Sequence, residues 1–229
     1  MTPLTKSLTD YSNPRSVGSR LRLRRMAHLM PLIESVFRQK GSVKILDVGG
    51  TSTYWGILSQ DYLASRRVEI TLLNLPGELH NSSSPPFSVV EGDACDVADF
   101  ADNSFDLVHS NSVLEHVGDW VRMKAFAHEV KRLAPRYFVQ TPNYWFPIEP
   151  HFMCPFFHWL PEPVRVRLLL RTGLGHYPRA ESVDVAVSAV QGARLLNRSM
   201  LASLFPDATI VTERVALLAK SLMAVRSLD

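Results

Sequence analysis

The sequence is poor in cysteine and has no long apolar run. Its 229 residues include two cysteines, Cys95 and Cys154, which are too few and too unpatterned for a disulfide framework or a metal site. No segment approaches the roughly 20 apolar residues of a membrane-spanning helix, and the first eleven residues lack the apolar core of a signal peptide. We therefore expect a cytoplasmic protein, and we predict no metal site.

Charge is nearly balanced, with a formal net charge of +3. The basic excess lies in the first 40 residues, where eight lysines and arginines face only Asp10 and Glu34. Such a run can contact nucleic acid or an anionic membrane surface. More commonly it is the solvated face of a helix, and we do not expect nucleic acid as a partner.

Hydrophobic periodicity predicts strands that alternate with helices. Helices are expected at 19–39, which Pro31 kinks or divides, at 54–64 and at 119–133. Strands are expected at 43–48, 68–73, 88–91, 105–109 and 137–140, with two further β-rich stretches at 208–215 and 221–225. This order predicts one α/β domain built on a parallel sheet that an antiparallel hairpin closes. Its parts would be an arm and helix (1–40), a core (43–140), a lid insertion (141–200) and the closing hairpin (205–229).

Polar residues follow the first four predicted strands. Ligands of an open parallel sheet bind outside the carboxyl ends of its strands, so we expect these residues to converge on a nucleoside-type cofactor. They are Asp47, Gly49 and Gly50 after the first strand, Asn74 after the second, Asp93 and Ala94 after the third, and Ser110 and Asn111 after the fourth.

In these motifs the chain resembles the class I S-adenosylmethionine-dependent methyltransferases, and in particular the type 11-like group with a Leu-Glu-His signature. The matching segments are Ile-Leu-Asp-Val-Gly-Gly at 45–50, Glu-Gly-Asp-Ala at 91–94, Asp-Asn-Ser-Phe-Asp-Leu-Val at 102–108 and Ser-Val-Leu-Glu-His-Val at 112–117. The resemblance covers residues 43–140. It implies a Rossmann-like, doubly wound, seven-stranded and mostly parallel sheet with a C-terminal antiparallel hairpin, and S-adenosyl-L-methionine as cofactor.

The resemblance also implies roles for individual residues. Asp47 would hold the methionine end of the cofactor, Asn74 would bind the ribose hydroxyls, and Asp93 would accept the adenine amino group. The other cofactor residues that we predict are Gly49, Gly50, Thr51, Leu75, Ala94, Ser110 and Asn111.

The chain departs from the family pattern at three positions. Thr51 and Thr53 stand where the family usually has glycines, and Asn74 stands where it usually has an acid. An amide binds a diol without the charge assistance of a carboxylate. These departures leave open a non-catalytic protein that binds the cofactor or a partner as a scaffold.

The segment Tyr144–Trp159 is rich in aromatic residues and proline. It holds seven of the 21 aromatic residues, and six of the fifteen prolines fall between 142 and 163. So many prolines exclude a regular helix or a central strand. We expect a lid with an aromatic pocket for a small-molecule acceptor, or alternatively a hydrophobic plug that closes the core. The basic stretch Val164–Arg171 suits either a peripheral membrane contact or a solvated helix face.

Methyl transfer from a sulfonium is an in-line displacement that depends on alignment. A general base is needed only when the acceptor must lose a proton. The candidates are His116, Glu149 and His151, each of which also suits a structural role.

We predict a small-molecule methyltransferase, with O-methylation slightly ahead of N- or C-methylation. The acceptor would be a sugar, a lipid-linked molecule or an aromatic secondary metabolite. A NAD(P)-dependent reductase is disfavoured, because the sequence has neither Gly-x-Gly-x-x-Gly after the first strand nor a Tyr-x-x-x-Lys pair.

Overall fold

The computed structural model describes residues 17–77 and 84–228, and its centre is a seven-stranded sheet. The strand order is β3-β2-β1-β4-β5-β9-β8. Strands β1 to β5 are parallel to one another, and β9 runs antiparallel to both β5 and β8. The bounds are β1 Val43–Val48, β2 Val68–Asn74, β3 Phe87–Glu91, β4 Leu107–Asn111, β5 Arg136–Pro142, β8 Thr209–Val215 and β9 Leu218–Arg226. The predicted doubly wound α/β fold is confirmed.

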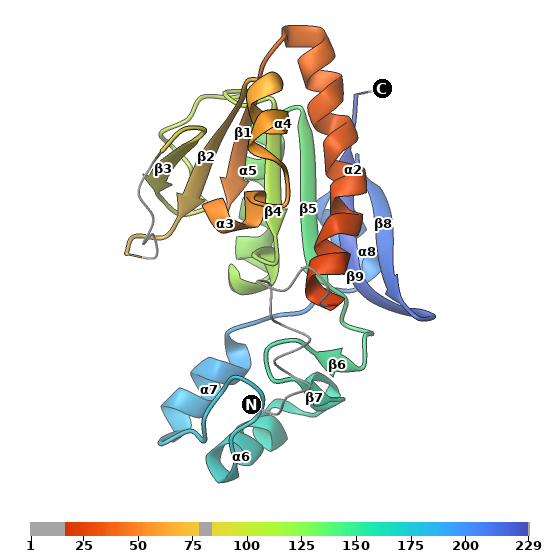
Figure 1. The fold of residues 1–229 in the computed structure, drawn as a ribbon. Helices are drawn as coiled ribbons and strands as arrows, with labels where there is room; N and C mark the ends of the chain where they lie inside the picture. The colour runs from red at the N-terminus through yellow and green to blue at the C-terminus, as the bar shows by residue number, and fades with distance from the viewer. Residues whose placement is uncertain (1–16, 78–83, 229) are drawn as a thin grey trace.

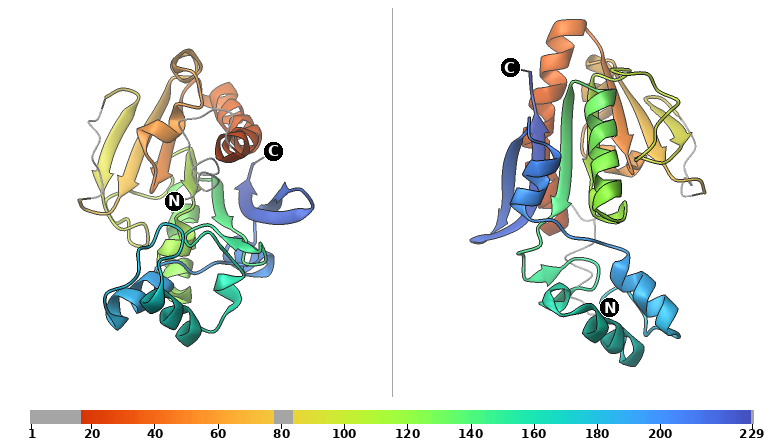
Figure 2. Two further views of the ribbon diagram at one scale, coloured as in Figure 1. Left: turned by 60° about the horizontal axis from the view of Figure 1, so that its bottom comes forward. Right: turned by 180° about the vertical axis from the view of Figure 1, so that it is seen from behind.

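Helices cover both faces of the sheet (Figures 1 and 2). The first face packs against α2 (Val17–Lys40), α3 (Ser52–Trp55) and α4 (Gln60–Ser65), and the second against α5 (Trp120–Leu133) and α8 (Arg198–Leu204). The central strands are therefore buried on both sides, which explains the continuous apolar run of β1. None of the described helices is long and apolar enough to cross a membrane.

Two helix predictions need correction. Helix α2 continues through Pro31, so the proline does not divide it. Pro31 is exposed, while Leu29, Ile33 and Val36 of the same helix are buried against the sheet and offset the lost hydrogen bond. The single helix expected at 54–64 is in fact the pair α3 and α4, because the Ser59 side chain caps a new helix by accepting from the Tyr62 amide.

A small separate layer lies beyond the carboxyl ends of β4 and β5. It contains the two-stranded sheet β6 (Ile148–Glu149) and β7 (Cys154–Pro155), with α6 (Glu162–Arg171) and α7 (Val183–Gln191). Figure 1 shows these elements together at the bottom of the molecule. We call residues 144–195 the lid. It has a core of its own, formed by Phe152, Phe157, Leu169, Ala180, Ala186 and Val190.

The N-terminal arm expected at residues 1–16 and part of the loop expected at 76–86 lie outside the described residues. The basic run that follows the arm is not uniformly solvated. Arg25 is buried and forms an ion pair with Glu213, with Nη2 2.8 Å from Oε2. The interpretation of the run as a solvated helix face is therefore wrong for this residue.

Candidate functional site

The turns after β1, β2 and β3 are bonded to one another at the carboxyl edge of the sheet. The Gly49 amide donates to the Leu73 carbonyl (2.8 Å), and the Gly92 amide donates to the Asn74 carbonyl (2.8 Å). The Asn74 side-chain amide donates to the Gly50 carbonyl at 3.0 Å, which leaves its Oδ1 as an acceptor. The structure thus brings residues from the first three turns together, as the sequence predicted.

The two glycines of the β1 turn are required by its geometry. Gly49 has φ +69°, in the left-handed region that favours glycine. A Cβ on Gly50 would lie 1.7 Å from Oδ2 of Asp47, so only glycine fits above that carboxylate. The turn therefore presents bare backbone at the edge where a ligand approaches.

Asp47 supports this turn from inside the protein. It is buried, and its oxygens accept from Nε1 of Trp55 at 2.7 Å and from Nδ1 of His109 at 2.6 Å. The His109 ring stacks on Phe138, with ring centroids 5.5 Å apart. Asp47 thus fixes the position of the Gly49–Gly50 backbone through contacts within the core.

Asp93 presents a charged carboxylate after β3. Both of its oxygens accept from Nη2 of Arg122 (2.8 and 2.7 Å), and Oδ1 also accepts from the Cys95 amide at 2.9 Å. Burial by itself would raise the pKa of Asp93, but the hydrogen bonds from Cys95 and Arg122 outweigh it and lower that pKa. Its side chain is 37% exposed, so the carboxylate remains open to a donor on a ligand.

The remaining predicted cofactor residues differ in their surroundings. Thr51 and Leu75 are exposed, Ala94 is half-buried, and Ser110 is fully buried with an Oγ that lacks a partner among the described residues. Asn111 Oδ1 accepts from Nη1 of Arg25 at 2.8 Å. The buried arginine of α2 therefore fixes the end of β4.

The three candidate catalytic residues form one continuous cluster. Nδ1 of His151 contacts Oε1 of Glu149, and Nε2 of His151 lies 3.0 Å from Nε2 of His116. Nδ1 of His116 lies 2.7 Å from the Gly192 carbonyl oxygen. Burial alone would lower the pKa of His151, but its hydrogen bond to Glu149 and the nearby Glu115 raise it. We call Glu115, His116, Glu149 and His151 the histidine cluster.

Glu115 is the member of the cluster that the sequence analysis did not single out. It precedes His116 in the short 3-10 helix Leu114–His116 and is fully buried. Burial raises the pKa of its carboxyl group. Its Oε2 accepts from Thr141 at 2.9 Å, and its Oε1 lacks a partner among the described residues. The signal for it was a carboxylate directly after the apolar pair Val113 and Leu114.

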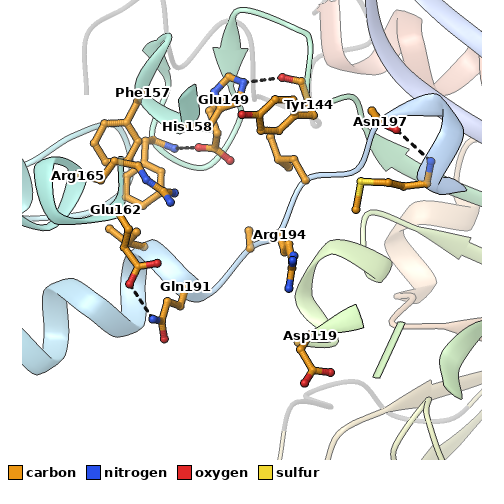
Figure 3. Close-up of a pocket in the computed structure, with 16 residues that line it drawn as sticks. Asp119, Tyr144, Glu149, Phe157, His158, Glu162, Arg165, Gln191, Arg194 and Asn197 are labelled. Carbon is orange, nitrogen blue, oxygen red and sulfur yellow. Dashed lines mark hydrogen bonds between the residues drawn. The ribbon is translucent and has the colours of Figure 1, made fainter. Parts of the chain in front are cut away.

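A cavity of about 750 Å³ lies between the lid and the start of α5 (Figure 3). Its wall combines apolar side chains with polar ones, and Glu149 links it to the histidine cluster. The lining residues include Asp119, Tyr144, Glu149, Phe157, His158, Arg165 and Arg194. None of the ten predicted cofactor residues is among those that line it.

Two lining residues carry buried polar atoms without partners among the described residues, Nδ1 of His158 and Nε of Arg165. Nε2 of His158 donates to the Tyr144 carbonyl at 2.8 Å, which leaves Nδ1 as an acceptor. Burial lowers the pKa of His158 and keeps the ring neutral. A functional role was predicted from the sequence as one alternative for each of their segments, Tyr144–Trp159 and Val164–Arg171, but neither residue stood out within its segment.

The fold and this edge are consistent with a class I methyltransferase domain. Residues 46–135 match the model of a family described as a methyltransferase domain, so this part of the chain is similar to the S-adenosylmethionine-dependent methyltransferases. This match supersedes the reductase alternative. No curated protein sequence matches the chain.

Several solved structures are similar to the chain. A 1,6-didemethyltoxoflavin-N1-methyltransferase of Burkholderia thailandensis, crystallised with S-adenosylhomocysteine, is 16% identical with a TM-score of 0.50, and the match covers 99% of this chain and 86% of that one. An O-methyltransferase family protein from the same organism is 14% identical (TM-score 0.48), covering 92% of this chain but 58% of that one. A SAM-dependent methyltransferase from Aquifex aeolicus is 13% identical (TM-score 0.44), covering 84% and 87%. The chain thus spans little more than half the length of the O-methyltransferase family protein.

S-adenosylmethionine is the cofactor of this domain class, and the carboxyl edge fits it. Gly49 and Gly50 present backbone to the methionine portion, and a Cβ on either one would clash with Val113 or Asp47 within the protein. Oδ1 of Asn74 can accept from a ribose hydroxyl, and the charged Asp93 can accept from the adenine amino group.

Proposed function

We propose that the protein transfers the methyl group of S-adenosylmethionine to a hydroxyl of a small molecule bound in the cavity beneath the lid. The observation that carries the proposal is that Glu149 belongs both to the wall of the cavity and to the histidine cluster. Side chains that can assist the loss of a hydroxyl proton therefore lie beside the space for an acceptor. The O-methyltransferase and N-methyltransferase neighbours are both compatible with a small-molecule acceptor.

The cavity suggests the chemical class of the acceptor. The aromatic rings of Tyr144 and Phe157 suit the faces of a planar ring. The unpartnered Nδ1 of His158 suits a hydroxyl donor, and the unpartnered Nε of Arg165 suits a carbonyl or carboxylate oxygen. Each buried unsatisfied group costs about 1–3 kcal/mol, which such a molecule would offset. We therefore favour a hydroxylated aromatic acid over a sugar or a lipid-linked acceptor.

Calorimetric titration with S-adenosylmethionine tests cofactor binding. We expect micromolar binding by the intact protein, weakened about 10- to 100-fold by Asp93→Ala, because a hydrogen bond to a charged group contributes about 1.5–3 kcal/mol. The matched control is Asp102→Ala, which removes another carboxylate that pairs with an arginine but is largely exposed and lies outside the site. Absence of binding by the intact protein would refute the methyltransferase function.

Radiolabel transfer from S-adenosyl-[methyl-³H]methionine tests the reaction itself. The panel consists of hydroxylated aromatic acids, and each is paired with the same acid in which the hydroxyl is already methylated. We expect label only in the free hydroxyl compounds. Cofactor binding without any transfer across the panel would favour the scaffold alternative that Thr51, Thr53 and Asn74 keep open.

A further inference from the structure

The histidine cluster brings together three groups that can ligate a metal ion. Glu115 and His116 come from the 3-10 helix after β4, and His151 comes from the lid between β6 and β7. One ligand atom from each of the three lies within 4.8 Å of the other two. His116 is exposed and His151 half-buried, so an ion can reach the site from solvent.

The hydrogen bonds fix where the ring protons lie. The Gly192 carbonyl oxygen can only accept, so Nδ1 of His116 carries a hydrogen. Nδ1 of His151 faces the buried Glu149 carboxylate and donates to it. With both Nδ1 atoms protonated, both Nε2 atoms of the neutral rings present lone pairs. These atoms face one another at 3.0 Å, which is repulsive unless a proton or a cation lies between them.

The two carboxylates of the cluster favour a divalent cation over a proton. Glu115 and Glu149 are both buried. In the part of the chain that the structure describes, no lysine or arginine side chain forms an ion pair with either one. One proton between the rings would leave a carboxyl group to take up a second proton, whereas a divalent cation would balance both groups as carboxylates. Oε1 of Glu115, buried and without a described partner, is the free ligand atom.

The surroundings of the rings match those of metal-binding histidines. Such histidines usually donate their second ring N–H to a carboxylate or a backbone carbonyl, which orients the ring. Glu149 serves His151 in this way, and the Gly192 carbonyl serves His116. Nitrogens that bind one tetrahedral zinc ion at about 2.0–2.1 Å lie about 3.3 Å apart. The observed 3.0 Å needs only a small outward shift of the two rings.

We propose that Glu115, His116 and His151 bind a divalent transition-metal ion, most suitably Zn²⁺, oriented by Glu149 and the Gly192 carbonyl. Two imidazoles and one carboxylate are a donor set that zinc accepts while a fourth position stays open. Its role rests on the proposed function, since Glu149 joins the cluster to the acceptor cavity. An acceptor hydroxyl at the open position would release its proton to water more readily. The resulting oxygen anion would attack the methyl carbon as the carbon–sulfur bond breaks, and the electron pair would remain on sulfur in S-adenosylhomocysteine.

Titration with Co²⁺, a spectroscopic substitute for Zn²⁺, tests the site. The full chain is first stripped with a chelator and then titrated while visible absorption and calorimetric heat are recorded. We expect one equivalent to bind with visible absorption bands and to be displaced by Zn²⁺. His116→Ala should abolish this binding without unfolding the protein, because the side chain is exposed, and Glu149→Gln should weaken it about 10- to 100-fold. His176→Ala, an exposed histidine outside the cluster, should bind as the wild type does.

The outcomes separate this proposal from the proposed function. Failure of the wild type to bind one equivalent of Co²⁺, or equal binding by His116→Ala, would overturn the metal site and leave a proton between the rings. The same stripped protein is titrated with S-adenosylmethionine. Cofactor binding without Co²⁺ binding refutes the metal site alone, and Co²⁺ binding without cofactor binding refutes the methyltransferase function alone.

Discussion

Replacing Arg25 by methionine should destabilise the protein strongly at neutral pH. Arg25 is buried, and its guanidinium donates to Glu213 at 3.0 and 2.8 Å, to Asn111 at 2.8 Å and to Gln140 at 3.0 Å. Removing one partner of a buried ion pair costs about 3–5 kcal/mol, because the other charge stays buried without its partner. For a chain of this size each kcal/mol lowers the melting temperature by about 2–4 °C, so the expected loss is about 6–20 °C.

Thermal unfolding followed by circular dichroism measures this loss. Arg24→Met is the matched control, because Arg24 is the exposed neighbour on the same helix and its replacement should change stability by less than about 0.5 kcal/mol. The double variant Arg25→Met with Glu213→Gln should recover much of the loss, because it removes the unpaired charge. If Arg25→Met melts within 2 °C of Arg24→Met, the buried pair does not hold the helix to the sheet as the contacts indicate.

The same pair predicts a pH dependence with a definite sign. Burial alone would raise the pKa of Glu213, but Arg25, Ser221 and Lys220 outweigh it and lower that pKa. The pair therefore stabilises the fold fully above the unfolded carboxyl pKa of about 4.3 and less as the pH falls toward the lowered folded value. In Arg25→Met the Glu213 carboxylate loses its main counter-charge. Protonation of Glu213 therefore removes an unpaired buried charge and stabilises the variant. The gap in melting temperature between wild type and variant should shrink from pH 7 to pH 4.

Three further substitutions test the turns and the lid. Gly50→Ala places a Cβ 1.7 Å from the Asp47 carboxylate. It should lower the stability measured by thermal unfolding by about 1–3 kcal/mol or more, and it should weaken the S-adenosylmethionine binding measured by calorimetry. Unchanged stability and binding would contradict the turn geometry. Trp55→Phe leaves one Asp47 oxygen without its donor, and denaturant titration should show a loss of about 1–3 kcal/mol. Gly175→Ala introduces strain, because residue 175 has φ +58° and a Cβ there would lie 2.3 Å from the Phe152 carbonyl oxygen. Limited proteolysis should therefore cut the lid of the variant faster than the lid of the wild type. Equal cleavage rates would contradict this strain.

Local sequence pattern was sufficient for the strands, because their physical causes are local. β1 is buried on both faces, so its sequence is a continuous apolar run from Val43 to Val48 broken only at Lys44 and Asp47. The polar residues at its end had to meet those of β2 and β3, since parallel strands end at one edge. The incorrect prediction of a single helix at 54–64 also has a local cause. Ser59 both fits the polar face of one long helix and can cap a second, and the sequence does not decide between the two.

The contacts of the histidine cluster could not be read from the sequence. His151 meets His116 across 35 residues, and Arg25 meets Glu213 across 188. The first contact depends on the path of the lid, and the second depends on the path of α2 over the sheet. No local sequence pattern specifies either path. Arg25 illustrates the limit well, because as one arginine among several in a basic helix it looks solvated until the fold places Glu213 beside it.

The lid is bonded to the core through the same short helix that carries Glu115 and His116. The incoming segment of the lid reaches it through His151, and the outgoing segment reaches it through Arg194, whose amide donates to the Glu115 carbonyl at 2.7 Å, and through the Gly192 carbonyl. Both ends of the lid thus meet at Glu115 and His116. A proton or a cation between His116 and His151 would hold the incoming segment in place, whereas the Gly192 and Arg194 hydrogen bonds hold the outgoing segment. Under the proposed function, the proton transfer from the acceptor and the position of the lid would therefore depend on one pair of adjacent residues.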